Sequence, residues 1–158
     1  MTIDPERRAE LVAQYEAGPA VLRGAVDGLS DAQLDHRPSD GGWTPREVVQ
    51  HVADSEMTSA IRLRRLIAED EPLIVAYDGD EFARRLHYAD RPIEPALAAV
   101  DAARATTAQI LHGLTEAEWG RTGTHSDAGA YGVGEWLETY SVHCHDHADQ
   151  IRRALAEA

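Results

Sequence analysis

The chain has 158 residues, a hydrophobic fraction of 43% and a formal net charge of −13. This length and composition exclude a disordered polymer and favour one domain spanning residues 1–158. The negative charge disfavours nucleic-acid binding, because a phosphate backbone would be repelled. No apolar run reaches about 18 residues and the N-terminus lacks an apolar signal segment, so we expect a soluble, cytoplasmic protein without a membrane partner.

The first predicted helix begins after Asp4, a suitable N-cap that is followed by Pro5 at the first helical position. It is expected to run toward Leu29, and the pair Gly18 and Pro19 should kink or divide it. The next stretch, LSDAQLDHRPSDGG, predicts a single helical turn followed by a loop. Polar, glycine-containing segments of this kind separate helices along the whole chain.

The second predicted helix has a well-marked start. Thr44 is an N-cap candidate, Pro45 occupies the first helical position, and Glu47 completes a capping box. This helix should continue to about Glu69. A long connection follows, with a short helix expected after Asp78.

Two more long helices are predicted, Ile93–Leu114 and Val133–Ala156. The connection between them, TEAEWGRTGTHSDAGAYG, is rich in glycine. We find no sustained strand-like alternation, although Leu73–Ala76 can form a short extended piece. Four long helices with apolar stripes predict an all-α fold, a four-helix bundle with long connections.

Three of the eight histidines fall within one stretch, YSVHCHDHADQ. In a helix, residues four apart lie nearly above one another, so His143 and His147 share a face while His145 points to nearly the opposite side. A histidine pair with this spacing is one way for a helix to present two nitrogens to a metal ion. A tight site needs a third ligand from another helix.

His51 is the best candidate for this third ligand, because it lies at the edge of the apolar stripe of the second helix. Glu47 and Asp54 on that helix, and Asp146 on the last helix, are candidates for orienting the histidines or for acting as a base. Alternatively, His51 is a structural histidine held by hydrogen bonds. An isolated pair of histidines four residues apart also occurs on solvated helix surfaces.

Other residues near these histidines have structural explanations. Trp136 and Tyr140 share the face of His143 and His147, and we expect core packing, with a pocket wall as a second role. Cys144 is expected to be a small core residue. We expect the remaining histidines at the surface: His36, His87, His112, His125 and His145.

Three segments together resemble the DinB-like superfamily of metalloproteins, and its YfiT-like branch most closely. They are GGWTPREVVQHVADSEM, VAYDGDEFARRL and YSVHCHDHADQI. The resemblance implies a metal triad of His51, His143 and His147. Asp146 and Gln150 stand where that branch often has histidines, which leaves the substrate in doubt.

The resemblance also implies a function. It suggests a divalent metal, most often zinc or nickel, an unusual helix order, and frequent homodimers. It favours a transferase that adds a low-molecular-weight thiol, such as bacillithiol or mycothiol, to a small electrophilic substrate. A three-histidine site leaves a coordination position open, so a metal-dependent hydrolase using water is the alternative. A third hypothesis is a non-catalytic stress protein that binds metal ions.

Overall fold

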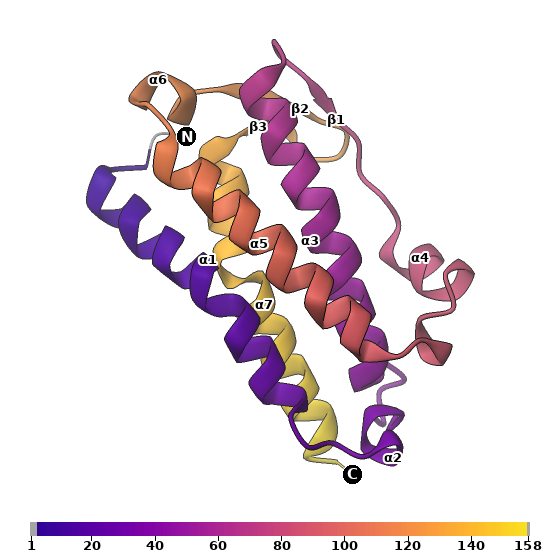
Figure 1. Cartoon of the computed structure of the whole chain (residues 1–158). Coiled ribbons are helices and arrows are strands. Elements are labelled where there is room, and N and C mark those ends of the chain that lie inside the picture. The colour runs from indigo at the N-terminus through magenta and orange to yellow at the C-terminus, as the bar shows by residue number, and fades with distance from the viewer. Residues whose placement is uncertain (1–2, 158) are drawn as a thin grey trace.

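The computed structural model describes residues 3–157 and contains four long helices (Figure 1). These are α1 (Pro5–Val26), α3 (Pro45–Ala68), α5 (Ile93–Gly113) and α7 (Val133–Leu155). Shorter elements connect them: α2 (Asp31–Leu34), β1 (Leu73–Ile74), α4 (Gly79–Arg85), the 3₁₀ turn η1 (Tyr88–Asp90), α6 (Glu116–Trp119), β2 (Thr122–His125) and β3 (Gly129–Gly132). No helix in the described range is long and apolar enough to span a membrane.

The order of the helices around the bundle differs from a simple up-and-down arrangement. The helix α1 packs against α5 and α7, and α3 also packs against α5 and α7. The pairs α1/α3 and α5/α7 are therefore diagonal, so the chain crosses the end of the bundle between them (Figure 1). The two crossings account for the connections 27–44 and 114–132, and they confirm the unusual helix order expected from the family resemblance.

The capping residues account for the helix starts. The Asp4 side chain accepts a hydrogen bond from the backbone N–H of Arg7, and Pro5 follows it directly. At the start of α3, the Thr44 and Glu47 side chains each accept a hydrogen bond from the other's backbone N–H. These reciprocal bonds satisfy donors that a helix start otherwise leaves unpaired.

A small sheet contains the short extended piece expected at Leu73–Ala76, as β1, and two strands that the sequence did not predict. β2 and β3 form an antiparallel hairpin, and β1 joins β2 in parallel. Residues 122–132 contain several glycines and no clear alternation of apolar and polar residues, so their pattern does not identify a strand. The strand β2 is identified by its pairing with β1 and not by its own sequence pattern. Leu73 and Ile74 of β1 lie opposite Thr124 and His125 of β2.

The α1 helix also corrects an expectation, since it is continuous through Gly18 and Pro19. Proline has no N–H, so the carbonyl oxygen of Tyr15, four residues earlier, lacks its usual helical partner. Arg104 of α5 donates a hydrogen bond to that oxygen. A side chain at Gly18 would collide with the Arg104 guanidinium and with Cys144. The Gly18-Pro19 pair thus leaves space and a free carbonyl oxygen for the Arg104 side chain, and it does not break the helix.

The core consists of two apolar clusters separated by buried polar residues. One cluster lies around Leu22, Val52 and Ile151, and the other around Leu11, Leu63 and Leu137. Between them, the buried polar side chains Glu56, Ser59, Arg104, Thr107 and Ser141 occupy the bundle interior. The candidate site lies at the edge of this polar layer.

Candidate metal centre

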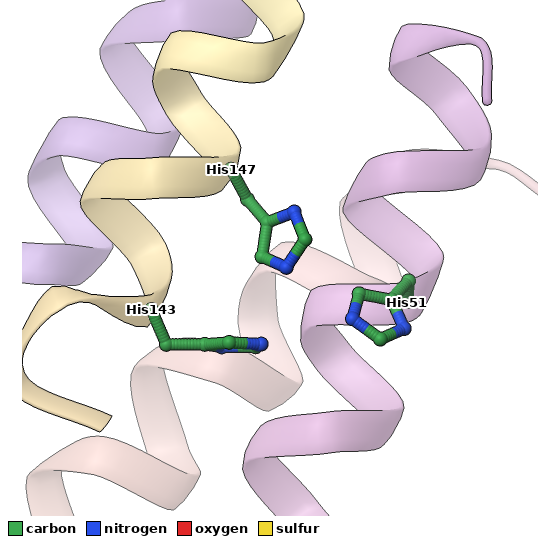
Figure 2. Close-up of side chains that lie close together, drawn as sticks. All are labelled: His51, His143 and His147. Atoms are coloured by element: carbon green, nitrogen blue, oxygen red, sulfur yellow. The ribbon is translucent and has the colours of Figure 1, made fainter. Parts of the chain in front are cut away.

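Three histidines from two neighbouring helices converge at one place in the bundle. His143 and His147 point from α7 toward His51 on α3 (Figure 2). One ligand atom from each ring lies within 4.8 Å of the ligand atoms of the other two. Two nitrogens bound to one zinc ion are at most about 4.2 Å apart, twice the usual bond length, so small ring rotations would suffice to share an ion.

Hydrogen bonds orient the two rings on α7. The Nδ1–H of His143 donates to Glu56 Oε1 at 2.9 Å, and the Nδ1–H of His147 donates to Gln150 Oε1 at 2.8 Å. Each acceptor favours the tautomer that keeps the Nε2 lone pair free for a metal. The buried Nδ1 of His51 has no hydrogen-bond partner among residues 3–157. Three converging imidazoles, two of them oriented by hydrogen bonds, fit a divalent metal ion.

Glu56 is held by an arginine that the bundle encloses. The Glu56 side chain is 0% exposed and that of Arg104 is 1% exposed, and Arg104 Nη2 lies 2.7 Å from Glu56 Oε1. Arg104 also donates to the Tyr140 carbonyl at 2.7 Å, and its guanidinium lies 4.1 Å from the centre of the Tyr15 ring. A chain of contacts therefore links α1, α5 and α3 to the His143 imidazole.

The pKa values favour neutral ligands and a charged carboxylate. Burial lowers the pKa of His51 to about 3, with help from the other two histidines, and it lowers the pKa of His147 to about 4. Burial alone would raise the pKa of Glu56, but the contacts with His143 and Arg104 outweigh it and hold the pKa below its usual value. Neutral imidazoles are the form that binds metal ions.

Cys144 does not resemble a metal ligand. It is buried in the core, and burial raises the pKa of its thiol to about 12. Its Sγ–H donates to Glu56 Oε1 over 3.8 Å. At neutral pH it is a protonated core residue, as the sequence indicated, because ligation and nucleophilic attack both need the thiolate.

A pocket of about 370 Å³ opens beside the histidines. Its lining includes His51 and His143 together with side chains of α3, the β1–α4 connection, the β2–β3 hairpin and α7. The further lining residues are Ser55, Arg62, Ala76, Tyr77, Gly79, His125, Asp127, Thr139 and Tyr140. The site can thus admit a small molecule to at least two of the three rings.

Among residues 3–157, no hydrogen bond joins the three acidic residues nominated from the sequence to the three histidines. Glu47 accepts hydrogen bonds from the Thr44 N–H and from Arg37. Asp54 accepts a hydrogen bond from the Tyr88 hydroxyl, and Asp146 is exposed. Glu56 and Gln150 occupy the orienting role instead. Glu56 was identifiable in principle, because it lies four residues after Val52 on the apolar stripe of α3.

The pocket-wall candidates on α7 divide into two roles. Trp136 is fully buried and donates from Nε1 to the Ser59 carbonyl at 2.9 Å, so it belongs to the core. Tyr140 is largely buried but lines the pocket, and its ring centre lies 5.5 Å from that of His143. Of these two residues, only Tyr140 is placed to contact a molecule in the pocket.

The surface assignment of the remaining histidines was partly wrong. His87 and His112 are exposed, as expected, whereas His36 is half-buried. His145 is half-buried where α7 packs against α1, and its Nε2 donates to the Gln14 carbonyl at 3.0 Å. His125 belongs to β2 and lines the pocket, because strand pairing that local sequence did not reveal brings it there.

The lowered pKa values predict a pH-dependent stability for the metal-free protein. Unfolding restores pKa values near 6.5, so the unfolded chain binds more protons at pH 5 and the free energy of unfolding falls from pH 7 to pH 5. Each of the two histidines contributes about 2 kcal/mol to this fall. Urea unfolding of chelator-treated protein at both pH values measures it.

A His51→Gln variant should lose about half of this effect, whereas His87→Asn, at an exposed position, should retain it. An unchanged pH dependence in His51→Gln would show that the imidazole is not held neutral by burial.

The chain is similar to several known proteins. Residues 14–151 match the DinB superfamily. A relative from Oceanobacillus iheyensis, bearing the name "putative metal-dependent hydrolase", is 34% identical over 142 residues, which are 90% of this chain and 82% of the relative. A Geobacillus kaustophilus protein with the same description is 34% identical over 90% of this chain and 80% of its own length.

The fold is also similar to a solved structure. YfiT from Bacillus subtilis, described as "a probable metal-dependent hydrolase with an unusual four-helix bundle topology", superposes with a TM-score of 0.91 at 30% identity. The match covers 97% of this chain and 88% of YfiT. Because the family match spans most of the sequence and both the fold and the helix order agree with this relative, the chain belongs to the DinB superfamily.

Proposed function

We propose that this protein is an enzyme that holds one divalent metal ion with His51, His143 and His147 and uses it to activate a nucleophile. The observation that carries the proposal is the convergence of three imidazoles beside a pocket. Among the described residues, the cluster contains these three ligands and no fourth. Three protein ligands with an open position are typical of catalytic zinc sites, whereas structural sites are usually closed by four.

The ion would supply charge stabilisation for a bound nucleophile, lowering the pKa of a thiol or of water. The protein's own groups would supply ligand geometry and a confined pocket. Glu56 and Gln150 keep His143 and His147 oriented, and Tyr140 forms part of the wall beside them. A substrate held there is positioned before it reacts, which lowers the entropic part of the barrier.

We favour a thiol as the nucleophile. Within residues 3–157, the pocket lining has one carboxylate, Asp127, and it is exposed in the β2–β3 turn. Arg104 and His143 both bond Oε1 of Glu56 and lower the pKa of this carboxylate, which makes it a weak base. A thiol has an ordinary pKa of about 8.5 and needs less help from a protein base than water does. The thiolate would form a bond to carbon of the electrophile, and the leaving group would depart with its electron pair.

Hydrolysis is the second candidate, and the names of the relatives favour it at least as strongly. It needs the same three histidines, because a divalent ion alone can bring the pKa of water to about 7. Zinc and nickel suit an all-imidazole site. The two reactions differ in whether a thiol is consumed, so one pair of assays separates them.

The test uses zinc- and nickel-loaded protein in two parallel assays. One follows S-arylation of cysteine by chlorodinitrobenzene, and the other follows hydrolysis of p-nitrophenyl acetate without thiol. We expect chelator-sensitive S-arylation that His143→Ala abolishes. Ester hydrolysis without S-arylation would establish the hydrolase instead. Inactivity in both assays across several thiols would contradict the enzymatic proposal and leave a metal-binding protein.

A further inference from the structure

The histidine pocket has a second chemical feature, the Arg62 guanidinium in its lining. Most arginines of this chain form ion pairs with carboxylates, for example Arg23 with Asp101 and Arg46 with Asp35. Arg62 has no carboxylate within ion-pair distance among residues 3–157, although the chain contains 28 acidic residues. It is a half-buried cation without a counter-ion, facing a pocket.

The hydrogen bonds of Arg62 leave most of its donors unused. Its Nη2 donates to the Val75 carbonyl at 2.8 Å, which fixes the side chain against the β1–α4 connection. Its Nη1 reaches the Tyr140 hydroxyl at 3.4 Å, a long and weak contact. The Nε is buried without a partner among the described residues. A guanidinium offers five N–H donors, and its fork matches a carboxylate.

Aromatic groups surround this cation and connect it to the histidines. The guanidinium carbon lies 5.7 Å from the centre of the Tyr77 ring. Tyr140 contacts Arg62 through its hydroxyl and His143 through its ring, at 5.5 Å between ring centres. Along α3, the backbone of Arg62 lies about 16 Å beyond that of His51, and the Arg62 side chain crosses part of this span to reach Tyr140. The pocket therefore has a metal-binding end and a separate cationic end.

We propose that Arg62 binds a carboxylate of the substrate while the substrate's reacting atom lies at the histidine end. The inference rests on the proposed function and adds a substrate class, an elongated molecule with a terminal carboxylate. Tyr77 and Tyr140 supply hydroxyl and ring contacts around that group. The lining also contains Asp127, whose negative charge disfavours a dianionic phosphate in this pocket more strongly than a singly charged carboxylate. In a protein with net charge −13, the Arg62 guanidinium supplies the local positive charge that attracts the carboxylate.

The test measures binding to cobalt-substituted protein. Mercaptocarboxylic acids of three, six and eight carbons are compared with the matching mercaptoalcohols, and the thiolate-to-cobalt absorbance reports occupancy. We expect the wild type to prefer at least one of the longer acids over its alcohol by about tenfold, as for a charge-assisted hydrogen bond. In Arg62→Met this preference should disappear while alcohol binding and cobalt content stay the same. Arg62→Lys should keep part of it.

Arg64→Met is the matched control, because Arg64 binds Thr106 and Thr107 on α5 and does not line the pocket. It should behave like the wild type. Equal affinities for acid and alcohol at every length, or a preference that survives Arg62→Met, would overturn the subsite.

A metal-free arm separates this inference from the proposed function. Hexanoate is titrated into chelator-treated protein, and the Nε–H resonance of Arg62 is followed by NMR. A shift at Arg62 that is lost with hexanol supports the subsite, and its absence overturns it. Failure of cobalt to bind contradicts the metal centre and the proposed function, whatever the hexanoate result.

Discussion

An Arg104→Met variant is expected to lose about 3–5 kcal/mol of unfolding free energy, the cost of breaking a buried ion pair from one side. The substitution leaves the Glu56 carboxylate 0% exposed with one fewer partner. It also leaves the carbonyl oxygens of Tyr15 and Tyr140 without the donor that now reaches them. Urea denaturation followed by circular dichroism measures the loss.

Two controls test the cause of this effect. Arg153→Met removes an exposed arginine and should change stability by no more than about 0.5 kcal/mol. The double variant Glu56→Leu/Arg104→Met should recover a substantial part of the loss, because no unpaired charge remains in the core. A loss in Arg104→Met below about 1 kcal/mol would show that Glu56 becomes protonated or hydrated at little cost.

A His143→Ala variant should bind zinc more than about 100-fold more weakly than the wild type. Removing a residue that only orients a ligand commonly lowers the metal affinity about 10–100-fold, and removing the ligand itself lowers it further. Competition with a chromophoric chelator measures the affinity, and circular dichroism checks that the helices remain. His51→Ala and His147→Ala should show losses of the same kind.

His145→Ala is the matched control for this series. It removes an imidazole two residues along α7, but that ring bonds the Gln14 carbonyl of α1 and lies outside the three-histidine cluster. Its metal affinity should stay within a few-fold of the wild type. A loss as large as that of His143→Ala would mean that the ligand set is drawn from a different face of the helix.

Much of the histidine cluster could be predicted from helical geometry. The spacing of four between His143 and His147 places both rings on one face of any regular helix. The capping pattern of Thr44, Pro45 and Glu47 marked the start of α3, which the structure confirms. These are local properties, so they can be derived from a short stretch of sequence.

The supporting residues depend on contacts between helices, and local rules did not find them. Glu56 and Arg104 occupy apolar stripes, where a charged residue signals a buried pair, but only the packed bundle shows which residues meet. Gly18 and Pro19 indicated a break when read alone. In the fold they form the niche that receives Arg104. His125 reached the pocket through strand pairing between distant segments.

The most direct test of the metal centre is X-ray absorption at the zinc edge of the zinc-loaded full chain. We expect one ion per chain with three imidazole nitrogens at about 2.0–2.1 Å and a further light-atom ligand. The imidazole signal should diminish in His51→Ala, His143→Ala and His147→Ala and persist in His145→Ala. A sulfur ligand at about 2.3 Å, or a wild-type spectrum that survives His51→Ala unchanged, would contradict the three-histidine site.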